Sequence, residues 1–184
     1  MIRKLFIPAA LLALLSAVVP ATAGAAVASR AQACPGAYSI PRAATMPQAR
    51  TATICLMNFE RALRRQVPLR ASGGLTTAGN RHSADMVSRR YFSHVSSGNV
   101  SFTTRILRTR YVAPRGAWQL GENIAWGGGE LATPAATVGA WMRSPGHRAN
   151  ILKSTYREVG VGMTLGTPTG IAGATYAAEY GRRG

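Results

Sequence analysis

The chain has 184 residues, and its 22 Lys and Arg against six Asp and Glu give it a formal charge of +16. This length is that of one domain with a sizeable hydrophobic core. The positive charge favours anionic partners such as wall polymers, lipid headgroups or acidic glycans. A compositional bias toward arginine and alanine is the alternative explanation. Nucleic acid is not expected as a partner, because no motif for binding it is present.

The first 28 residues have the pattern of a secretory signal peptide. Arg3 and Lys4 precede the apolar run LFIPAALLALLSAVV, and small residues follow. Cleavage after Ala23 or after Ala28 fits this pattern, and the loss of Arg3 and Lys4 lowers the formal charge from +16 to +14. No later stretch has the roughly 18 consecutive apolar residues that a membrane-spanning helix needs. We therefore expect a secreted protein, extracellular or associated with the cell wall, without a transmembrane segment and monomeric.

Residues 29–50 are expected to form an N-terminal arm, because Pro35, Pro41 and Pro47 interrupt it and no periodicity is visible. Cys34 and Cys55 are the two cysteines of the chain. In an exported protein they are expected to form a disulfide, with two free thiols as the alternative. Such a bond would attach the arm to the first helix and stabilise the fold by about 3 kcal/mol.

Ordered structure is expected to begin near Thr51. The segments TATICLMNFERALRRQV and LTTAGNRHSADMVSRR have apolar residues at helical spacing. His82 lies on the apolar stripe of the second helix, which predicts a core histidine with a satisfied hydrogen bond. FTTRILRTR predicts a short third helix and ENIAW a strand. Thr133-Pro134 and Ser144-Pro145 each combine a capping hydroxyl with a proline in the first turn, which predicts two further helix starts.

The last third of the chain has strand character. From 158 to 165, Val, Met and Leu alternate with Glu, Gly and Thr, which predicts a strand with one apolar face. TPTG then turns the chain, and IAGATYAAEYG returns as an antiparallel partner. With helices early and strands late, the order predicts an α+β sandwich and not a parallel βαβ sheet.

His94, Glu122 and His147 are the candidate chemical groups. His94 lies where a helix gives way to a loop and His147 in the first turn of a helix, and functional side chains often lie at such positions. Two imidazoles and a carboxylate could hold a zinc ion with an open coordination position. They could also act as acid and base without a metal.

Five motifs in order give the sequence a specific resemblance: HSADM, YFSH, GENIAWG, WMRSPGHRANIL and REVGVG, preceded by TICLMNFERA. Together they resemble the bacterial branch of the CAP superfamily, also called SCP-like or SCP/PR1 domains. The resemblance covers residues 51 to 180, and the domain is expected to span residues 51–184.

The resemblance implies a three-layer α-β-α sandwich with a central antiparallel sheet and a solvent-open cleft, in which many members bind a divalent metal. The matching motif positions assign His94, Glu122 and His147 to this cleft, with zinc or calcium as the candidate metal. His82, Asn150 and Glu158 are candidate supporting residues, and Asn150 is expected to orient its loop through its amide.

This sequence departs from the family pattern at one position. Animal and plant members usually bring a second glutamate from the helix before the second histidine, whereas GAWMRSPGH contains no acid. Glu158 or Glu130 could replace it, although the phase of the strand favours a solvated or capping role for Glu158.

Three functions are compatible with these residues, and whether the protein is an enzyme stays open. The favoured one is a secreted module that binds a metal or a small ligand such as a lipid, a glycan or a cell-wall component. The second is a metal-assisted hydrolase of peptide or cell-wall material, in which the metal on His94 and His147 lowers the pKa of its bound water. The third is a non-catalytic cell-surface protein that binds anionic polymers. No serine or cysteine triad can be assembled.

Overall fold

The computed structural model describes residues 30, 32–113 and 115–184, so the predicted signal peptide lies outside the described residues. The helical elements are η1 (Ala43–Thr45), α2 (Met46–Ala62), α3 (Gly73–Ser88), α4 (Phe102–Leu107), η2 (Gly129–Ala132), α5 (Pro134–Arg143) and α6 (Pro145–Leu152). The strands are β1 (Arg70–Ala71), β2 (Trp118–Gly128), β3 (Glu158–Leu165) and β4 (Gly173–Arg183).

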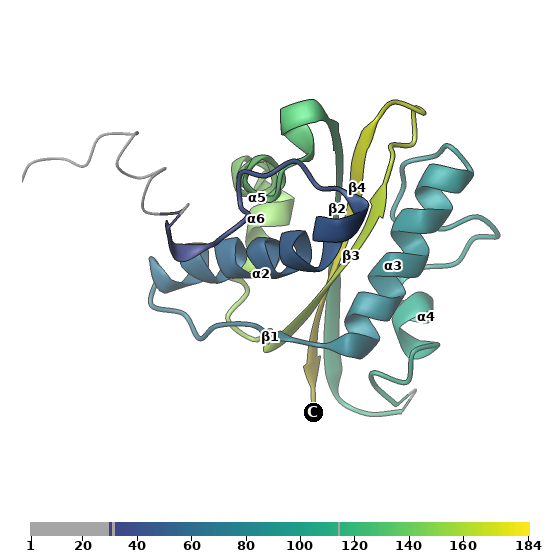
Figure 1. Ribbon diagram of the computed structural model, residues 1–184. Coiled ribbons are helices and arrows are strands. Elements are labelled where there is room, and N and C mark those ends of the chain that lie inside the picture. The colour runs from purple at the N-terminus through teal and green to yellow at the C-terminus, as the bar shows by residue number, and fades with distance from the viewer. Residues whose placement is uncertain (1–29, 31, 114) are drawn as a thin grey trace, which may run out of the picture.

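The four strands form one sheet in the order β1-β3-β4-β2. The long strands are antiparallel, with Glu122 opposite Glu179 in the β2–β4 pair and Gly160 opposite Glu179 in the β3–β4 pair. The sequence did not predict β1, which pairs in parallel with β3 over two residues. Helices α2, α5 and α6 cover one face of the sheet, and α3 and α4 cover the other (Figure 1). The predicted α+β fold with its α-β-α layers is confirmed.

The two predicted helix starts are confirmed. The Thr133 hydroxyl accepts a hydrogen bond from the backbone N–H of Ala136, and Pro134 is the first residue of α5. Ser144 and Pro145 begin α6 in the same way, although the Ser144 side chain makes no capping hydrogen bond. A capping hydroxyl and a proline thus begin α5, whereas for α6 the proline in the first turn is the local signal that the structure bears out.

The expectation that order begins near Thr51 is wrong, because α2 begins at Met46. Pro47 lies in the first turn of this helix, where a proline costs no hydrogen bond, instead of interrupting the chain. The arm before it is also packed: Cys34 and Ala37 are buried in the main hydrophobic core. The predicted disulfide joins Cys34 to Cys55, with an S–S distance of 2.02 Å, so the arm is fixed to the middle of α2.

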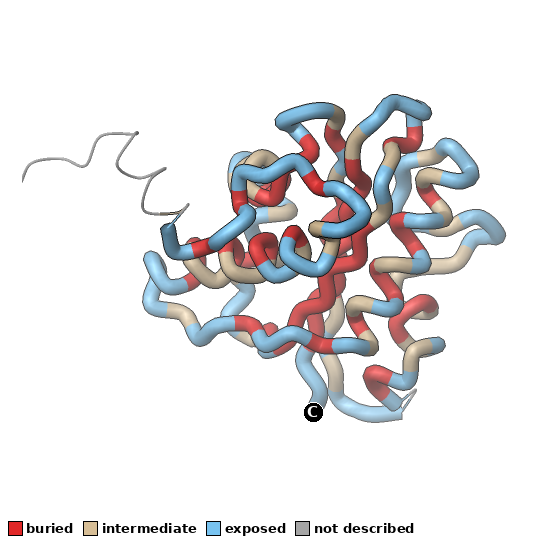
Figure 2. The backbone as a smooth tube through the Cα atoms, viewed as in Figure 1, coloured by how far each residue is buried: buried red, intermediate tan, exposed pale blue. Residues whose placement is uncertain are grey.

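The prediction of one apolar face for β3 is incomplete, because both of its faces are buried from Glu158 to Met163 (red in Figure 2). The glycines that alternate with the apolar residues face α3. A Cβ atom on Gly162 would lie 1.8 Å from the backbone carbon of Gly79. Glycine is therefore required where α3 crosses β3. The alternating pattern suggested that this face of β3 is exposed, but it is a close helix–sheet contact.

None of the helices in the described ranges has the length and apolar character needed to cross a membrane.

Candidate functional site

The candidate site is centred on β2, the edge strand of the sheet. Glu122 and Asn123 are consecutive in this strand, so their side chains point to opposite faces. Glu122 points toward α3 and α4, and Asn123 points toward α6. Gly121 precedes them because a Cβ atom there would lie 2.3 Å from the Tyr156 hydroxyl. That hydroxyl donates a hydrogen bond to the carbonyl of Leu120 and secures the strand.

His94 is held by Glu122. Its Nδ1 donates to Glu122 Oε1 over 2.7 Å. The His94 side chain is 50% exposed, whereas that of Glu122 is 1% exposed. The carboxylate therefore fixes the orientation of an imidazole that is accessible to solvent.

Arg105 of α4 forms an ion pair with the other oxygen of Glu122, Oε2, through its Nη2. Nη1 of the same guanidinium donates to three acceptors in the loop that carries His94: the carbonyls of His94 and Val100 and the Ser96 hydroxyl. Arg105 thus joins this loop to the strand that carries Glu122.

These contacts keep Glu122 ionised. Burial alone would raise the pKa of this carboxyl, but the hydrogen bond from His94 and the positive charge of Arg105 outweigh burial, so the pKa lies below its ordinary value. The carboxylate is buried and paired, which is the arrangement that a buried charge requires.

His82 lies in the core beside this pair, as predicted. It is fully buried, Nε2 donates to the Ser93 carbonyl over 2.9 Å, and Nδ1 accepts from the Ser96 hydroxyl at 3.0 Å. Its Nε2 is also 3.7 Å from Glu122 Oε2. Burial lowers the pKa of His82 more than the charge of Glu122 raises it. A neutral His82 therefore holds the loop that carries His94 through its hydrogen bonds to Ser93 and Ser96.

Asp85, one turn later on α3, holds the far part of the same loop. Its carboxylate accepts from the Tyr91 hydroxyl at 2.5 Å and from the Ser97 hydroxyl at 3.2 Å, and it pairs with Arg89. Burial alone would raise the pKa of Asp85, but these hydrogen bonds outweigh burial and lower it.

His147 approaches from the opposite layer. It lies in the first turn of α6, half-buried, and its carbonyl accepts a hydrogen bond from Asn123 Nδ2 over 3.0 Å. Burial and then the nearby His94 lower the pKa of His147. The structure therefore brings His94, Glu122 and His147 to one edge of the sheet.

Asn150 connects α6 to β2. Its Nδ2 donates to the Glu122 carbonyl over 3.1 Å and to Asn123 Oδ1 over 2.9 Å. Its amide thus orients the backbone that carries Glu122, rather than the loop before His147.

A second carboxyl lies next to Glu122, and the sequence did not point to it. Glu179 of β4 is the direct cross-strand neighbour of Glu122 and is fully buried. Neither of its carboxyl oxygens has a hydrogen-bond partner of good geometry among the described residues. Burial, and then the charge of Glu122, raise the pKa of Glu179 well above its ordinary value. A neutral carboxyl thus lies beside an ionised one.

Neither acid proposed as the replacement for the second glutamate contacts Glu122. Glu158 accepts hydrogen bonds from the Tyr111 hydroxyl at 2.7 Å and from Arg183 Nη2 at 2.6 Å, and the Arg183 bond above all lowers its pKa. It is buried rather than solvated. Glu130 lies in η2 on the rim of a separate pocket.

In the observed arrangement of side chains, the Glu122 carboxylate is not free to act as a metal ligand. One oxygen accepts from His94 and the other pairs with the cation of Arg105, which would repel a divalent ion. Within the described ranges, no group of three or more His, Cys, Asp or Glu side chains is arranged to hold a metal. A site on the imidazoles of His94 and His147 stays a prediction.

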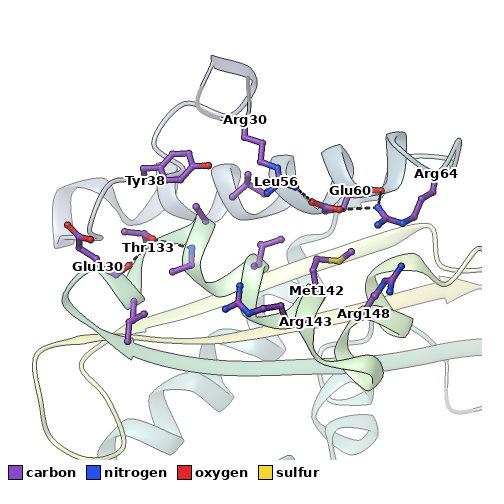
Figure 3. Close-up of a pocket in the computed structure, with 15 residues that line it drawn as sticks. Arg30, Tyr38, Leu56, Glu60, Arg64, Glu130, Thr133, Met142, Arg143 and Arg148 are labelled. Carbon is purple, nitrogen blue, oxygen red and sulfur yellow. Dashed lines mark hydrogen bonds and ion pairs between the residues drawn. The ribbon is translucent and has the colours of Figure 1, made fainter. Parts of the chain in front are cut away.

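A cavity of about 860 Å³ lies in the other layer, between α2 and α5 and beneath the N-terminal arm (Figure 3). Its apolar lining comes from Leu56, Leu131, Ala135, Ala136, Val138 and Met142. Four arginines, Arg30, Arg64, Arg143 and Arg148, also line it. Sequence periodicity could place apolar residues on facing helices, but it gave no sign that they leave a space.

Arg105 and Glu179 are the site residues that sequence reasoning missed. A signal for Glu179 exists, because it is a lone acid in the strand ATYAAEYG, where its neighbours are small or aromatic. Arg105 is one of 22 basic residues and had no distinguishing neighbour. Only the packing of α4 against β2 shows that it meets Glu122.

The fold and the site define an α-β-α sandwich with a His/Glu cluster at the edge of its sheet. Residues 55–175 match the CAP family, described as the Cysteine-rich secretory protein family. The chain belongs to this family, and the resemblance inferred from its motifs is confirmed.

Two relatives from Bacillus subtilis strain 168 share parts of the sequence. The uncharacterized protein YkwD is 35% identical over 107 residues, 58% of this chain and 39% of that protein. The uncharacterized membrane protein YlbC is 43% identical over 82 residues, 45% of this chain and 22% of that protein. The chain thus aligns with less than half the length of either relative.

Two solved structures share the fold. An extracellular protein containing an SCP domain from Bacillus anthracis strain Ames has a TM-score of 0.64 at 24% identity, over 78% of this chain and 44% of that one. An outer surface protein from Borrelia burgdorferi has a TM-score of 0.61 at 16% identity, over 76% of this chain and 96% of that one. At these identities the likeness shows the fold alone.

Proposed function

We propose that this CAP domain is a secreted binding protein that holds an amphipathic, anionic ligand of the lipid class in the cavity between α2 and α5. Secretion is supported by the signal-peptide pattern and by the Cys34–Cys55 disulfide, since disulfides persist in oxidising compartments. The observation that carries the ligand class is a cavity that apolar side chains and four arginines line together.

The size and lining of the cavity fit a lipid chain. Small-molecule sites are clefts of roughly 300–1,000 Å³ with mostly apolar walls and a few polar groups, and this cavity has about 860 Å³. Leu56, Val138 and Met142 line it from the facing helices α2 and α5. An acyl chain would bury its surface against these side chains.

The charges around the cavity select an anion. Glu60 pairs with Arg30 at 2.6 Å and with Arg64 at 3.0 Å, so one carboxylate serves two arginines. Arg143 and Arg148 have no ion-pair partner within the described ranges. Arginine binds carboxylate and phosphate groups through two parallel hydrogen bonds. Glu130 lies at the opposite end of the cavity from Arg148 (Figure 3), so a headgroup is expected near Arg143 and Arg148.

The test is displacement of a fluorescent fatty acid from the protein expressed into an oxidising compartment. Arg143→Gln/Arg148→Gln should weaken binding of an anionic lipid roughly tenfold, because two charge-assisted contacts are lost. The matched control is Arg81→Gln/Arg108→Gln, which removes the same charge from exposed positions on α3 and just after α4.

Equal loss in both variants would show that net charge and not the cavity governs binding, and would refute the proposal. Absence of binding to the wild type would do the same.

A second candidate function is acid–base catalysis at His94, the metal-free form of the hydrolase hypothesis. The observation in its favour is the Glu122 carboxylate, which holds Nδ1 of a half-exposed imidazole and leaves Nε2 free for proton transfer. Loss of hydrolysis of cell-wall peptides on His94→Ala, with the fold retained, is the result that this candidate requires.

A further inference from the structure

We propose that one end of this molecule docks on an anionic lipid bilayer through a cluster of exposed apolar side chains. This inference goes beyond the ligand in the cavity and does not depend on it. It rests on a different set of residues, most of which do not line the cavity.

The cluster lies where β2 and β3 end, at the upper end of the molecule in Figure 1. There η2, the β3–β4 turn and the N-terminal arm come together. Six of the ten exposed large apolar side chains in the described ranges belong to these segments or to the last residues of β2 and β3, so they are concentrated and not scattered. We call them the apolar end: Tyr38, Ile40, Trp126, Leu131, Leu165 and Ile171.

Contacts between the segments confirm that they are neighbours. A Cβ atom added to Gly128 would lie 3.0 Å from Ile171 Cδ1, and one added to Gly127 would lie 2.9 Å from Leu131 Cβ. The carbonyl of Ala37 accepts a hydrogen bond from the N–H of Ala135 over 2.8 Å, which fixes the arm beside the start of α5. The arm, η2 and the turn therefore present their apolar side chains at one end.

The charges at this end favour an anionic surface. Arg42 is exposed two residues after Ile40. Arg90 is exposed just beyond the end of α3. The last turn of α3 lies beside the β3–β4 turn, since a Cβ atom added to Gly166 would lie 3.2 Å from Val87 Cγ1. The acids here are Glu130 and Asp85, and Asp85 is paired with Arg89.

The charge of the whole molecule acts in the same direction. Residues 29–184 carry a formal charge of +14, which is the +16 of the chain without Arg3 and Lys4. A negative lipid surface attracts such a protein within about one Debye length, roughly 8–10 Å.

A bilayer fits this end better than a second copy of the chain does. Two copies that each carry +14 repel one another. The apolar side chains also come from separate turns, and they include Trp126 and Tyr38, whose rings suit the boundary between headgroups and acyl chains.

The test is cosedimentation with vesicles of phosphatidylcholine, with and without phosphatidylglycerol. The wild-type protein is expected to bind the anionic vesicles, and Ile40→Asn/Ile171→Asn should lower the partition coefficient at least tenfold. Neither residue lines the cavity, so this variant should still bind the fluorescent fatty acid. Loss of vesicle binding with retained fatty-acid binding separates the docking surface from the proposed ligand site.

The matched control is Leu63→Asn/Val67→Asn. Leu63 and Val67 are 62% and 57% exposed, against 45% and 52% for Ile40 and Ile171, but they lie beyond the C-terminal end of α2, away from the apolar end. Vesicle binding of this control should match that of the wild type. An equal loss of vesicle binding in both double variants would overturn the proposal, because binding would then depend on exposed apolar residues anywhere on the surface.

A second readout reports which end meets the lipid. Vesicles that contain brominated acyl chains should quench the tryptophan fluorescence of the wild type. Trp126→Phe should abolish most of this quenching, since Trp141 is buried and Trp118 lies at the opposite end of β2. Unchanged quenching in Trp126→Phe would place another face on the bilayer and overturn the proposal. Concentration-dependent dimerisation without lipid, lost in Ile40→Asn/Ile171→Asn, would assign the apolar end to a second copy instead.

Discussion

The two faces of the sheet use side chains in opposite ways. On the α3/α4 face, Glu122 pairs with Arg105 and accepts a hydrogen bond from His94, and the buried His82 bonds to Ser93 and Ser96 of the same loop. On the α2/α5 face, aromatic and aliphatic residues form the main core and leave a cavity beside it. The family motifs therefore mark a buried polar network in which both oxygens of Glu122 are engaged, whereas the cavity of about 860 Å³ lies in the other layer.

This difference matters for assigning function from motifs. Glu122, whose two oxygens are engaged by His94 and Arg105, can position one exposed group, His94, but it has little capacity left for a ligand. The cavity combines apolar walls with Arg143 and Arg148, which have no ion-pair partner among the described residues, so it can accept an anionic ligand without breaking an internal ion pair. We expect mutations on the first face to change stability and mutations on the second to change binding.

The largest expected effect is that of Arg105→Met. It removes the charge that pairs with Glu122 and leaves the acceptors of the His94 loop without a donor. The free energy of unfolding should fall by roughly 3–5 kcal/mol, the cost of breaking a buried ion pair on one side. Urea denaturation measures it, with Arg108→Met as an exposed control. A loss no greater than that of the control would mean that the network does not hold this face together.

A smaller, pH-dependent effect is expected for Glu179→Gln. Because the pKa of Glu179 is raised in the folded state, the unfolded chain releases this proton at lower pH. Wild-type stability therefore falls as the pH rises above the ordinary value for glutamate toward the raised value in the fold. Glutamine does not titrate, so the variant should gain stability relative to the wild type as the pH rises above the ordinary value for glutamate, by up to about 1.4 kcal/mol per pH unit.

The measurement for Glu179 is thermal or urea unfolding of both proteins across this range. Glu158→Gln is the contrasting control, because the Arg183 hydrogen bond lowers the pKa of Glu158 and the sign reverses. A Glu179→Gln variant that loses stability relative to the wild type as the pH rises would contradict a protonated Glu179.

The smallest expected effect is the heat of zinc binding. A site on two imidazoles alone is weak, and the structure leaves only His94 and His147 for it. Any saturable binding should be lost in His147→Ala and should be retained, weakened roughly 10- to 100-fold, in Glu122→Gln, because Glu122 would be the hydrogen-bond partner of the ligand His94. Abolition by Glu122→Gln in a calorimetric titration would instead make Glu122 a ligand, as the motif predicted.

Much of the fold was predictable because its signals are local. Thr133 and Pro134 begin α5 through a capping hydroxyl and a first-turn proline, and Pro145 begins α6, and neither signal needs a distant partner. The β3–β4 hairpin follows from alternation around a turn. Pro47 shows the limit of such signals, since a proline can interrupt a chain or begin a helix, and the residues after it decide between the two.

The site was predictable in part, for a related reason. His94, Glu122 and His147 came from motifs, and the structure brings them to one edge. Arg105 and Glu179 join them only through the packing of α4 and the β2–β4 register, which links strands that are distant in sequence. The cavity depends on the separation of two helices, which no periodicity encodes.

The contact between Gly79 and Gly162 sets a limit on how this protein can evolve. Because their backbones touch, a side chain at either position would force α3 away from the sheet. His82 lies on the same helix, one turn after Gly79, and would move with it. Family members that keep the histidine cluster should therefore keep small residues at both positions together, and a larger residue at one should coincide with a changed cluster.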